Sequence, residues 1–262
     1  RQIERRSTLP ILSNVLIQAK DAKLTVTATD LDMIFIHNIS NVEINEEGET
    51  TTNSSIMHDI VRKFAAGKKI NVETISDTKL QLESEKSIFK LNCIDSKEFP
   101  LSEDDLGGED ININSQSFLK LLNKCKFSIS NDETRHYLSG IYLHTTNNEE
   151  KNYLTAVSTD SHRMSISKMR LSQPINFEPI ILPRKTIYQL CALLENFSGD
   201  IKIISKKNKI KFILKNSVLT SKVIDGKFPN YVQVIPKNNK KRLQADLNLS
   251  LIHISEPTRR SD

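Results

Sequence analysis

The chain has 262 residues, a formal net charge of +5 and a hydrophobic fraction of 37%. This composition is typical of a packed protein of one large or two ordinary domains, and it excludes disordered, collagen-like and low-complexity classes. No apolar run approaches about 18 residues and the opening residues are polar, so the sequence predicts neither a membrane span nor a secretory signal.

Three helices are predicted from apolar residues at helical spacing. The first covers residues 54–66, the second covers residues 115–127, and the third covers residues 186–197. A counterpart of the second helix in the first part of the chain would lie before Thr8, where few residues remain. Because the chain also begins with Arg1 rather than Met, we interpret its N-terminus as truncated.

Strands are predicted around these helices. Ile201, Ile203, Ile210, Phe212 and Leu214 alternate with lysines, which predicts two strands with one apolar face, joined by a hairpin at residues 206–208. Residues 236–241 resemble a linker. From Ser250 onward the sequence resembles translated sequencing-adapter DNA, so we expect residues 250–262 to be non-native.

An internal repeat organises these elements. Residues 24–30 resemble residues 154–160 at an offset of 130, and residues 94–100 resemble residues 224–229 at an offset of 130 to 129. Between these landmarks the predicted helices place Ile56 opposite Ile187, an offset of 131. We therefore expect an α+β fold with a first domain at residues 1–108, a complete second domain at 109–240 and a stub of a third at 241–262.

The polar faces of the predicted helices are basic. Such faces either meet solvent or present positive charge to the phosphates of a nucleic acid, without reading its sequence. They carry Arg62, Lys63, Lys68, Lys69, Lys120, Lys124, Lys126, Arg184 and Lys185.

No catalytic, metal or cofactor motif stands out. Asp160, Ser161 and His162 are the residue types of a hydrolase triad, but adjacent residues on an extended chain cannot converge on one reacting atom. Cys93, Cys125 and Cys191 lack the spacing of a zinc site or a disulfide framework, which favours a reduced, cytoplasmic protein. Paired acids such as Asp30 with Asp32 and Asp104 with Asp105 more often cap turns than bind a metal.

Several motifs in order along the chain resemble the bacterial beta sliding clamp family, the processivity subunit of DNA polymerase III. They are residues 8–16, 28–33, 159–164, 182–185 and 225–231. The resemblance implies repeated DNA-clamp domains, each with two helices packed on antiparallel sheets. It also implies that three domains form a subunit and that two subunits close head to tail around duplex DNA, with no catalytic site and no cofactor.

The resemblance further implies positions for three kinds of contact. The DNA-binding positions are Arg6, Tyr137, Arg184 and Lys185. The pocket for short peptide motifs comprises Leu138, Thr159, His162, Arg163, Met164, Pro229 and Val234, with core packing as the alternative for Leu138 and Met164. The ring-interface positions are Phe89 and Leu91, on an edge strand at residues 88–91.

Three departures from the family pattern bear on these positions. Asp132 stands where the family usually has a neutral residue, Ser161 stands where it commonly has glycine, and Gln233 stands where an arginine is frequent. The implied partners are non-specific double-stranded DNA and, through peptide motifs, the DNA polymerase III alpha subunit, the clamp loader and repair polymerases. The full-length parent is expected to form a homodimer, whereas this chain is not expected to close a ring.

Two other functions remain open at this point. One is an enzyme of unknown class on a repeated α+β scaffold, which would need converging carboxylates or histidines. The other is a sequence-specific DNA regulator, which would expose Asn, Gln or Arg to base edges, whereas the predicted helix faces carry mainly Lys.

Overall fold

The computed structural model describes residues 9–101, 107, 110–148, 151–175, 177–206, 208–236 and 241. The chain divides into two compact units, residues 1–228 and residues 229–262, and each is described by itself. The first unit contains all the strands and α-helices of the described residues. In the second unit, Tyr231–Val234 form a short 3-10 helix, η5.

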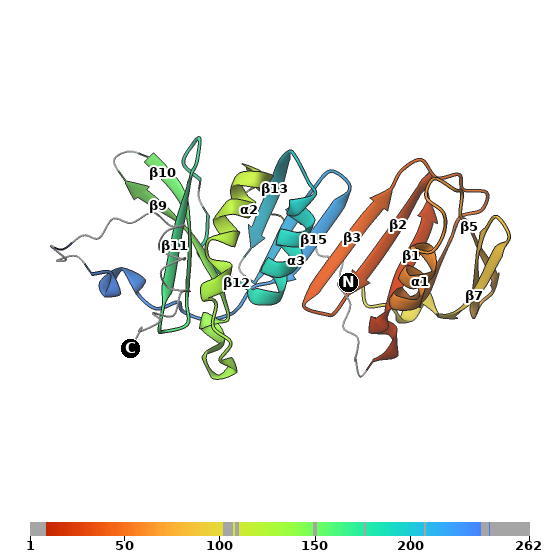
Figure 1. Ribbon diagram of the computed structural model, residues 1–262, viewed down its shortest axis with the longest axis horizontal. Helices are drawn as coiled ribbons and strands as arrows, with labels where there is room; N and C mark the ends of the chain where they lie inside the picture. The colour runs from red at the N-terminus through yellow and green to blue at the C-terminus, as the bar shows by residue number, and fades with distance from the viewer. Residues whose placement is uncertain are drawn as a thin grey trace, which may run out of the picture. The chain divides into compact units, whose positions relative to one another are not determined.

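The element order repeats along the first unit (Figure 1). The first copy consists of β1 (Asn14–Lys20), β2 (Lys23–Thr29), β3 (Met33–Ile39), β4 (Gly48–Asn53), α1 (Ser54–Val61), β5 (Asn71–Ser76), β6 (Lys79–Ser84) and β7 (Ser87–Ile94). The second copy consists of β9 (Gly140–Asn148), β10 (Lys151–Thr159), β11 (Met164–Arg170), β12 (Ile180–Pro183), α3 (Arg184–Glu195), β13 (Asp200–Lys206), β14 (Lys209–Ile213) and β15 (Ser217–Lys222). β8 (Asp110–Asn114) and α2 (Ser115–Asn123) precede these elements and share their core, so both are counted with the second copy.

Two antiparallel sheets contain these strands. The larger has eleven strands in the order β5-β6-β7-β4-β1-β2-β3-β15-β14-β13-β8, and the smaller has the order β11-β10-β9-β12. Pairing of β3 with β15 joins the two copies, with Phe35 opposite Leu219 and Ile36 opposite Val218. The α+β fold class with antiparallel sheets is therefore confirmed.

The helices differ from the predicted ranges at their ends. α1 ends at Val61 and α2 ends at Asn123, both earlier than predicted. After each helix the chain continues in isolated turns, and apolar side chains of these turns still pack on the core. α3 begins at Arg184, earlier than predicted, since Pro183 occupies its N-cap position. Asn53 and Pro183 are equivalent N-caps, so α1 and α3 are offset by 130 residues and Ile187 corresponds to Met57 rather than to Ile56.

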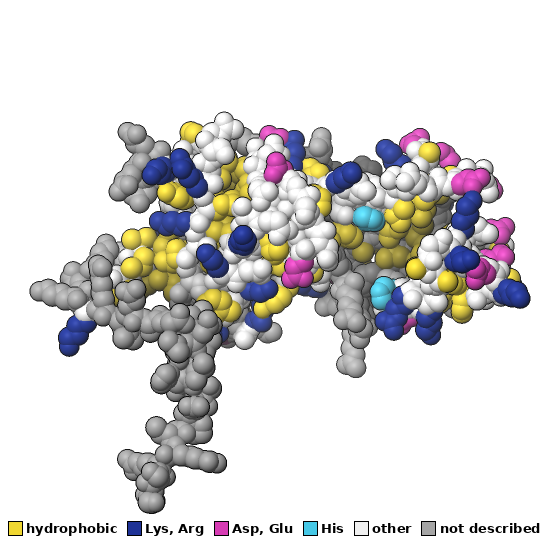
Figure 2. Space-filling view, turned by 45° about the horizontal axis from the view of Figure 1, so that its top comes forward, with side chains coloured by type: hydrophobic (Ala, Val, Ile, Leu, Met, Phe, Trp, Pro, Cys, Tyr) yellow, Lys and Arg dark blue, Asp and Glu magenta, His cyan; other side chains and the backbone are white. Residues whose placement is uncertain are grey.

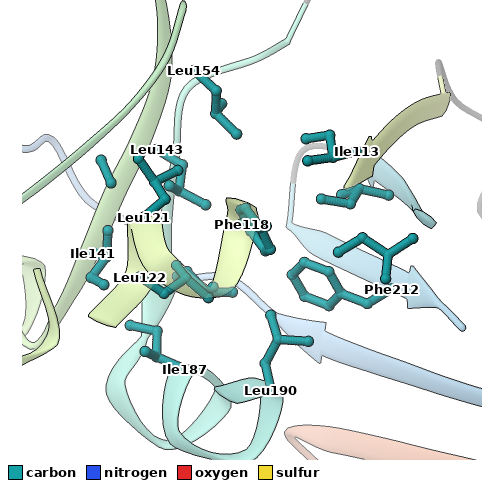
Figure 3. Close-up of a cluster of buried hydrophobic side chains, with 14 of the residues drawn as sticks. Ile113, Phe118, Leu121, Leu122, Ile141, Leu143, Leu154, Ile187, Leu190 and Phe212 are labelled. Atoms are coloured by element: carbon teal, nitrogen blue, oxygen red, sulfur yellow. The ribbon is translucent and has the colours of Figure 1, made fainter. Parts of the chain in front are cut away.

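The largest core surrounds α2 and α3 in the second copy (Figure 3). Phe118 of α2 and Phe212 of β14 are fully buried, with ring centroids 6.2 Å apart. Leu143 and Leu154 approach α2 from the smaller sheet, whereas Ile187 and Leu190 approach it from α3. Each buried side chain of this size contributes about 1.5–3 kcal/mol, so this core fixes both helices against both sheets.

The predicted apolar face of β13 and β14 is confirmed. Its five apolar residues are all buried, and Lys206 pairs with Lys209 across the predicted hairpin. Cys93, Cys125 and Cys191 are buried free thiols. Among the described residues, no helix is long and apolar enough to cross a membrane.

Candidate functional site

Two cations open α3 at its N-terminus. The start of a helix carries partial positive charge and favours acidic side chains, so Arg184 and Lys185 gain nothing from the helix dipole there. The Arg184 guanidinium lies over the ring of Tyr188, 5.5 Å from its centroid, and the Lys126 ammonium lies 5.9 Å from the same centroid. Tyr188 is exposed, so these three side chains form one cationic patch on the surface.

Sequence reasoning did not single out Tyr188. Its spacing of four residues from Arg184 places both on one face of α3, and that spacing was the available signal. The partnership with Lys126, in a different element, could not be inferred from spacing.

Lys185 is held by the first copy of the repeat. Its Nζ lies 2.5 Å from Oδ2 of Asp30, and the Asp30 side chain is 2% exposed. The other carboxylate oxygen of Asp30 accepts hydrogen bonds from the backbone N–H groups of Asp32 and Met33. Lys185 is therefore held in an ion pair that links the two copies of the repeat.

The other basic residues divide between the two copies. Near α1, Arg62, Lys68 and Lys69 lie within ion-pair distance of Asp59, Glu85 and Glu43, respectively. Lys120 on α2 and Lys124 at its C-cap are exposed and have no acidic partner among the residues that the structure describes. Figure 2 shows acidic side chains gathered mainly over the first copy, at the right. The charges of Lys120 and Lys124 are therefore less offset by nearby acidic side chains than the charges near α1.

The loop before β9 contains Asp132 and Tyr137. The Asp132 carboxylate accepts hydrogen bonds from the backbone N–H and the hydroxyl of Thr134 and pairs with Arg135 at 2.8 Å. These hydrogen bonds, followed by the charge of Arg135, lower the pKa of Asp132. The negative charge that departs from the family pattern is thus balanced within its own loop. Tyr137 is half-buried, and its ring edge contacts His136.

The predicted pocket residues Thr159, His162 and Arg163 form a tight turn between β10 and β11. The Asp160 carboxylate accepts hydrogen bonds from the backbone N–H groups of His162 and Arg163, both at 3.0 Å, and pairs with the Arg163 Nε at 2.9 Å. These backbone hydrogen bonds lower the pKa of Asp160. Ser161 has a φ of 77°, a left-handed conformation that glycine adopts without strain, which explains the glycine in the family pattern.

Arg135 links the loop to this turn, because its Nη1 donates to Ser161 Oγ at 2.7 Å. Phe127 is 57% exposed, and its ring lies under the Arg163 guanidinium at 5.6 Å. The turn therefore presents polar groups and one aromatic ring, all positioned by short contacts.

The apolar members of the predicted pocket are dispersed. Leu138 is 3% exposed, which supports core packing, its alternative. Met164 is half-buried at the start of β11. Pro229 and Val234 belong to the second compact unit, where Val234 is 69% exposed. The structure thus brings together Thr159, His162, Arg163 and Met164.

The remaining predicted residues have different surroundings. Arg6 lies outside the described residues. Phe89 is 38% exposed and packs edge-on against Phe64. Leu91 is 4% exposed and belongs to the hydrophobic core of the first copy. Phe89 and Leu91 lie on the same face of the sheet, the face toward α1, because they are two residues apart. The side chain of Leu91 has almost no exposed surface that a partner could contact. β7 also pairs with β4, but only through Cys93 and Ile94, and the Asn92 carbonyl accepts a hydrogen bond from Thr52. Among the described residues, the β7 edge is therefore free only over residues 87–91.

Within the part of the chain that the structure describes, no three His, Cys, Asp or Glu side chains are grouped so that they could hold a metal ion.

Two family models match the chain. The model of the DNA polymerase III beta subunit N-terminal domain matches residues 1–103, and that of its central domain matches residues 112–230. The beta sliding clamp of Caulobacter vibrioides is 35% identical over 249 residues, which cover 94% of this chain and 67% of that protein. The Escherichia coli clamp is 31% identical, with coverage of 93% and 65%.

Solved structures agree with these matches. The chain is similar to the Caulobacter crescentus beta sliding clamp with a TM-score of 0.87 and 35% identity, over 92% of this chain and 64% of that chain. A sliding clamp from Bartonella birtlesii bound to griselimycin gives a TM-score of 0.87 and 36% identity, over 91% and 64%. The chain spans about two thirds of the length of these relatives. It belongs to the bacterial beta sliding clamp family, the beta subunit of DNA polymerase III.

Proposed function

We propose that this chain is the N-terminal and central part of a processivity clamp that encircles duplex DNA and tethers the replicative polymerase. Family membership over 94% of the chain is the observation that carries the proposal. The alternative of an enzyme on a repeated scaffold has no support from these relatives. The proposal places the protein in the cytoplasm, where the bacterial chromosome is replicated, and divides the chain near residues 108 and 240.

Arg184, Lys126 and Tyr188 are the proposed centre of the DNA contact. The charge of Arg184 lies at a helix start where it does not stabilise the helix. The Tyr188 ring lies between Arg184 and Lys126 and restricts the motion of both cations without neutralising them. Tyr137 and Arg6 are proposed contacts from the family pattern alone. Lys185 can reach a phosphate only in competition with Asp30, so its proposed contribution is smaller.

The test is the residence of the full-length clamp on primed circular DNA. Replacing Arg184 with Gln is expected to shorten residence and to reduce its salt dependence, because each phosphate contact releases a counterion. Lys211→Gln, which removes a charge from the solvent face of β14, is the matched control and should leave residence unchanged. Equal residence for the Arg184 variant and the parent would contradict the DNA assignment.

A second proposed contact is the pocket for short peptide motifs of the polymerase alpha subunit, the clamp loader and repair polymerases. Thr159, His162, Arg163 and Met164 lie together at the start of β11, and a family relative has been solved with griselimycin bound. Pro229, Val234 and Leu138 complete the proposed pocket by resemblance to the family.

Titration with a fluorescent motif peptide tests this site. Met164→Lys is expected to abolish binding, because peptide contact would bury the new charge without a partner. Lys168→Ala, four residues along the same strand, should bind like the parent. If the Met164 variant binds equally well, the pocket lies elsewhere.

A further inference from the structure

Two lysines of the second copy pair with aspartates of one turn in the first copy. Lys185 pairs with Asp30. Lys222 pairs with Asp32 at 3.0 Å. The two pairs consist of the same residue types but differ in burial, because the side chain of Asp30 is 2% exposed and that of Asp32 is 75% exposed. Solvent and salt therefore weaken the Asp32 pair much more than the Asp30 pair.

The carboxylate of Asp30 depends on Lys185 for one of its two oxygens. Oδ1 accepts the two backbone hydrogen bonds of the turn. Oδ2 is buried and meets no donor other than Lys185 among the described residues. If Lys185 moved away, Oδ2 would remain charged in a buried site without a partner, which is unfavourable.

A DNA phosphate would have to compensate that loss before it could bind Lys185. Two charges at equal separation attract each other about four times more strongly at the effective dielectric of a protein surface than in bulk water. Asp30 is the more buried of the two possible anions, so we expect Lys185 to stay with Asp30 when duplex DNA is nearby.

Lys185 nevertheless belongs to the surface that carries the proposed DNA contact. It directly follows Arg184, and Tyr188 lies three residues further along α3, on the same side of the helix. The Lys185 side chain is 49% exposed, so its ammonium reaches solvent while it is paired. The pair as a whole adds no net charge to this surface.

We propose that Asp30 limits the affinity of this surface for DNA, because it holds Lys185 and thereby withholds one cation from the phosphates. The proposal rests on the proposed DNA contact of Arg184, Lys126 and Tyr188, and it concerns the strength of that contact. Removing the charge of Asp30 should turn Lys185 into an additional phosphate ligand.

Titration of a fluorescein-labelled linear duplex with this chain, at a series of salt concentrations, tests the proposal. Asp30→Asn is expected to tighten binding about two- to eightfold near 0.1 M salt and to steepen the dependence of log K on log salt by about 0.9, the effect of one further phosphate contact. The Asn side chain keeps a carbonyl oxygen for the two backbone N–H groups of the turn, and circular dichroism under the titration conditions verifies that the variant is folded.

Two further variants separate the release of Lys185 from a general change in charge. Asp32→Asn removes the same charge from the same turn but leaves Lys185 paired, so it should change the affinity less than about twofold. Asp30→Asn combined with Lys185→Gln removes both members of a neutral pair and should bind DNA like the parent.

A measurement on the parent needs no substitution at Asp30. Lysine acylation followed by mass spectrometry compares Lys126 with Lys185 in the presence and absence of the duplex. DNA should slow the acylation of Lys126, which the proposal places in contact with phosphate, and should leave the rate at Lys185 nearly unchanged.

Three results would each overturn the proposal. They are equal affinity of the Asp30→Asn and Asp32→Asn variants, a double variant that binds more weakly than the parent, and equal protection of Lys185 and Lys126 in the parent. Arg184→Gln should still weaken binding in each of these cases, which would leave the DNA contact itself in place. If Arg184→Gln also has no effect, or if no variant binds the duplex, both the proposed DNA contact and the role of Asp30 are wrong.

Discussion

Asp30 is a buried carboxylate with three partners, two in its own turn and one in the second copy of the repeat. One oxygen holds the turn through two backbone N–H groups, and the other meets Lys185 from the second copy. A single side chain therefore maintains both a local turn and a contact between the two copies of the repeat.

Two substitutions separate these roles. Asp30→Asn keeps a carbonyl oxygen for the backbone N–H groups but loses the charge, so we expect a modest loss of stability. Asp30→Ala leaves those N–H groups unsatisfied in a buried site, at a cost of about 1–3 kcal/mol for each. Urea unfolding of the parent and both variants checks the order, and equal stability for the two variants would contradict the assigned role of the turn.

Asp160 predicts a dependence of stability on pH. Its pKa lies below the ordinary value of 3.8, so the folded chain keeps this carboxylate charged at a pH where the unfolded chain takes up a proton. The stabilisation is present above the ordinary pKa and is lost as pH falls through the lowered value. Asp160→Asn should therefore flatten the acid side of the stability profile, as measured by thermal unfolding at a series of pH values.

At the scale of elements, α2 is held between the two sheets of the second copy by side chains that are almost all predictable from spacing. Phe118, Leu119 and Leu122 follow the apolar stripe of the sequence and are buried. The end of the helix was less predictable, because Cys125 continues the stripe although the chain has already left the α-helix. Periodicity reports which side chains face the core, whereas helix ends depend on capping and on the following turns.

Phe212 and Phe127 should differ strongly in their contribution to stability. Phe212→Ala should destabilise the chain by about 3–5 kcal/mol, because it leaves a cavity beside Phe118. Phe127→Ala should have little effect on stability, because that ring is 57% exposed. Denaturant unfolding of both variants measures the difference, and comparable losses would show that Phe127 has a structural role.

At the scale of the molecule, the internal repeat and its elements could be predicted because each copy repeats the same local pattern. The contacts between the two copies could not be predicted from the sequence. Lys185 and Asp30 are far apart in the sequence, and nothing near either residue signals the other; the same holds for β3 and β15. The burial of Leu91 could not be predicted either, because the core that covers its face of β7 forms only through tertiary packing.

The pairing of β3 with β15, which joins the two copies, is made largely of main-chain hydrogen bonds, and these are nearly independent of side-chain identity. A domain that carries a β3-type edge and a β15-type edge therefore brings both halves of its own connector when its gene is duplicated. A tandem copy can join its neighbour before any side chain has adapted, and charged pairs such as Asp30 with Lys185 can be added later. The arrangement permits proteins of this kind to grow by whole domains, while the strength of each junction is adjusted separately by a few surface charges.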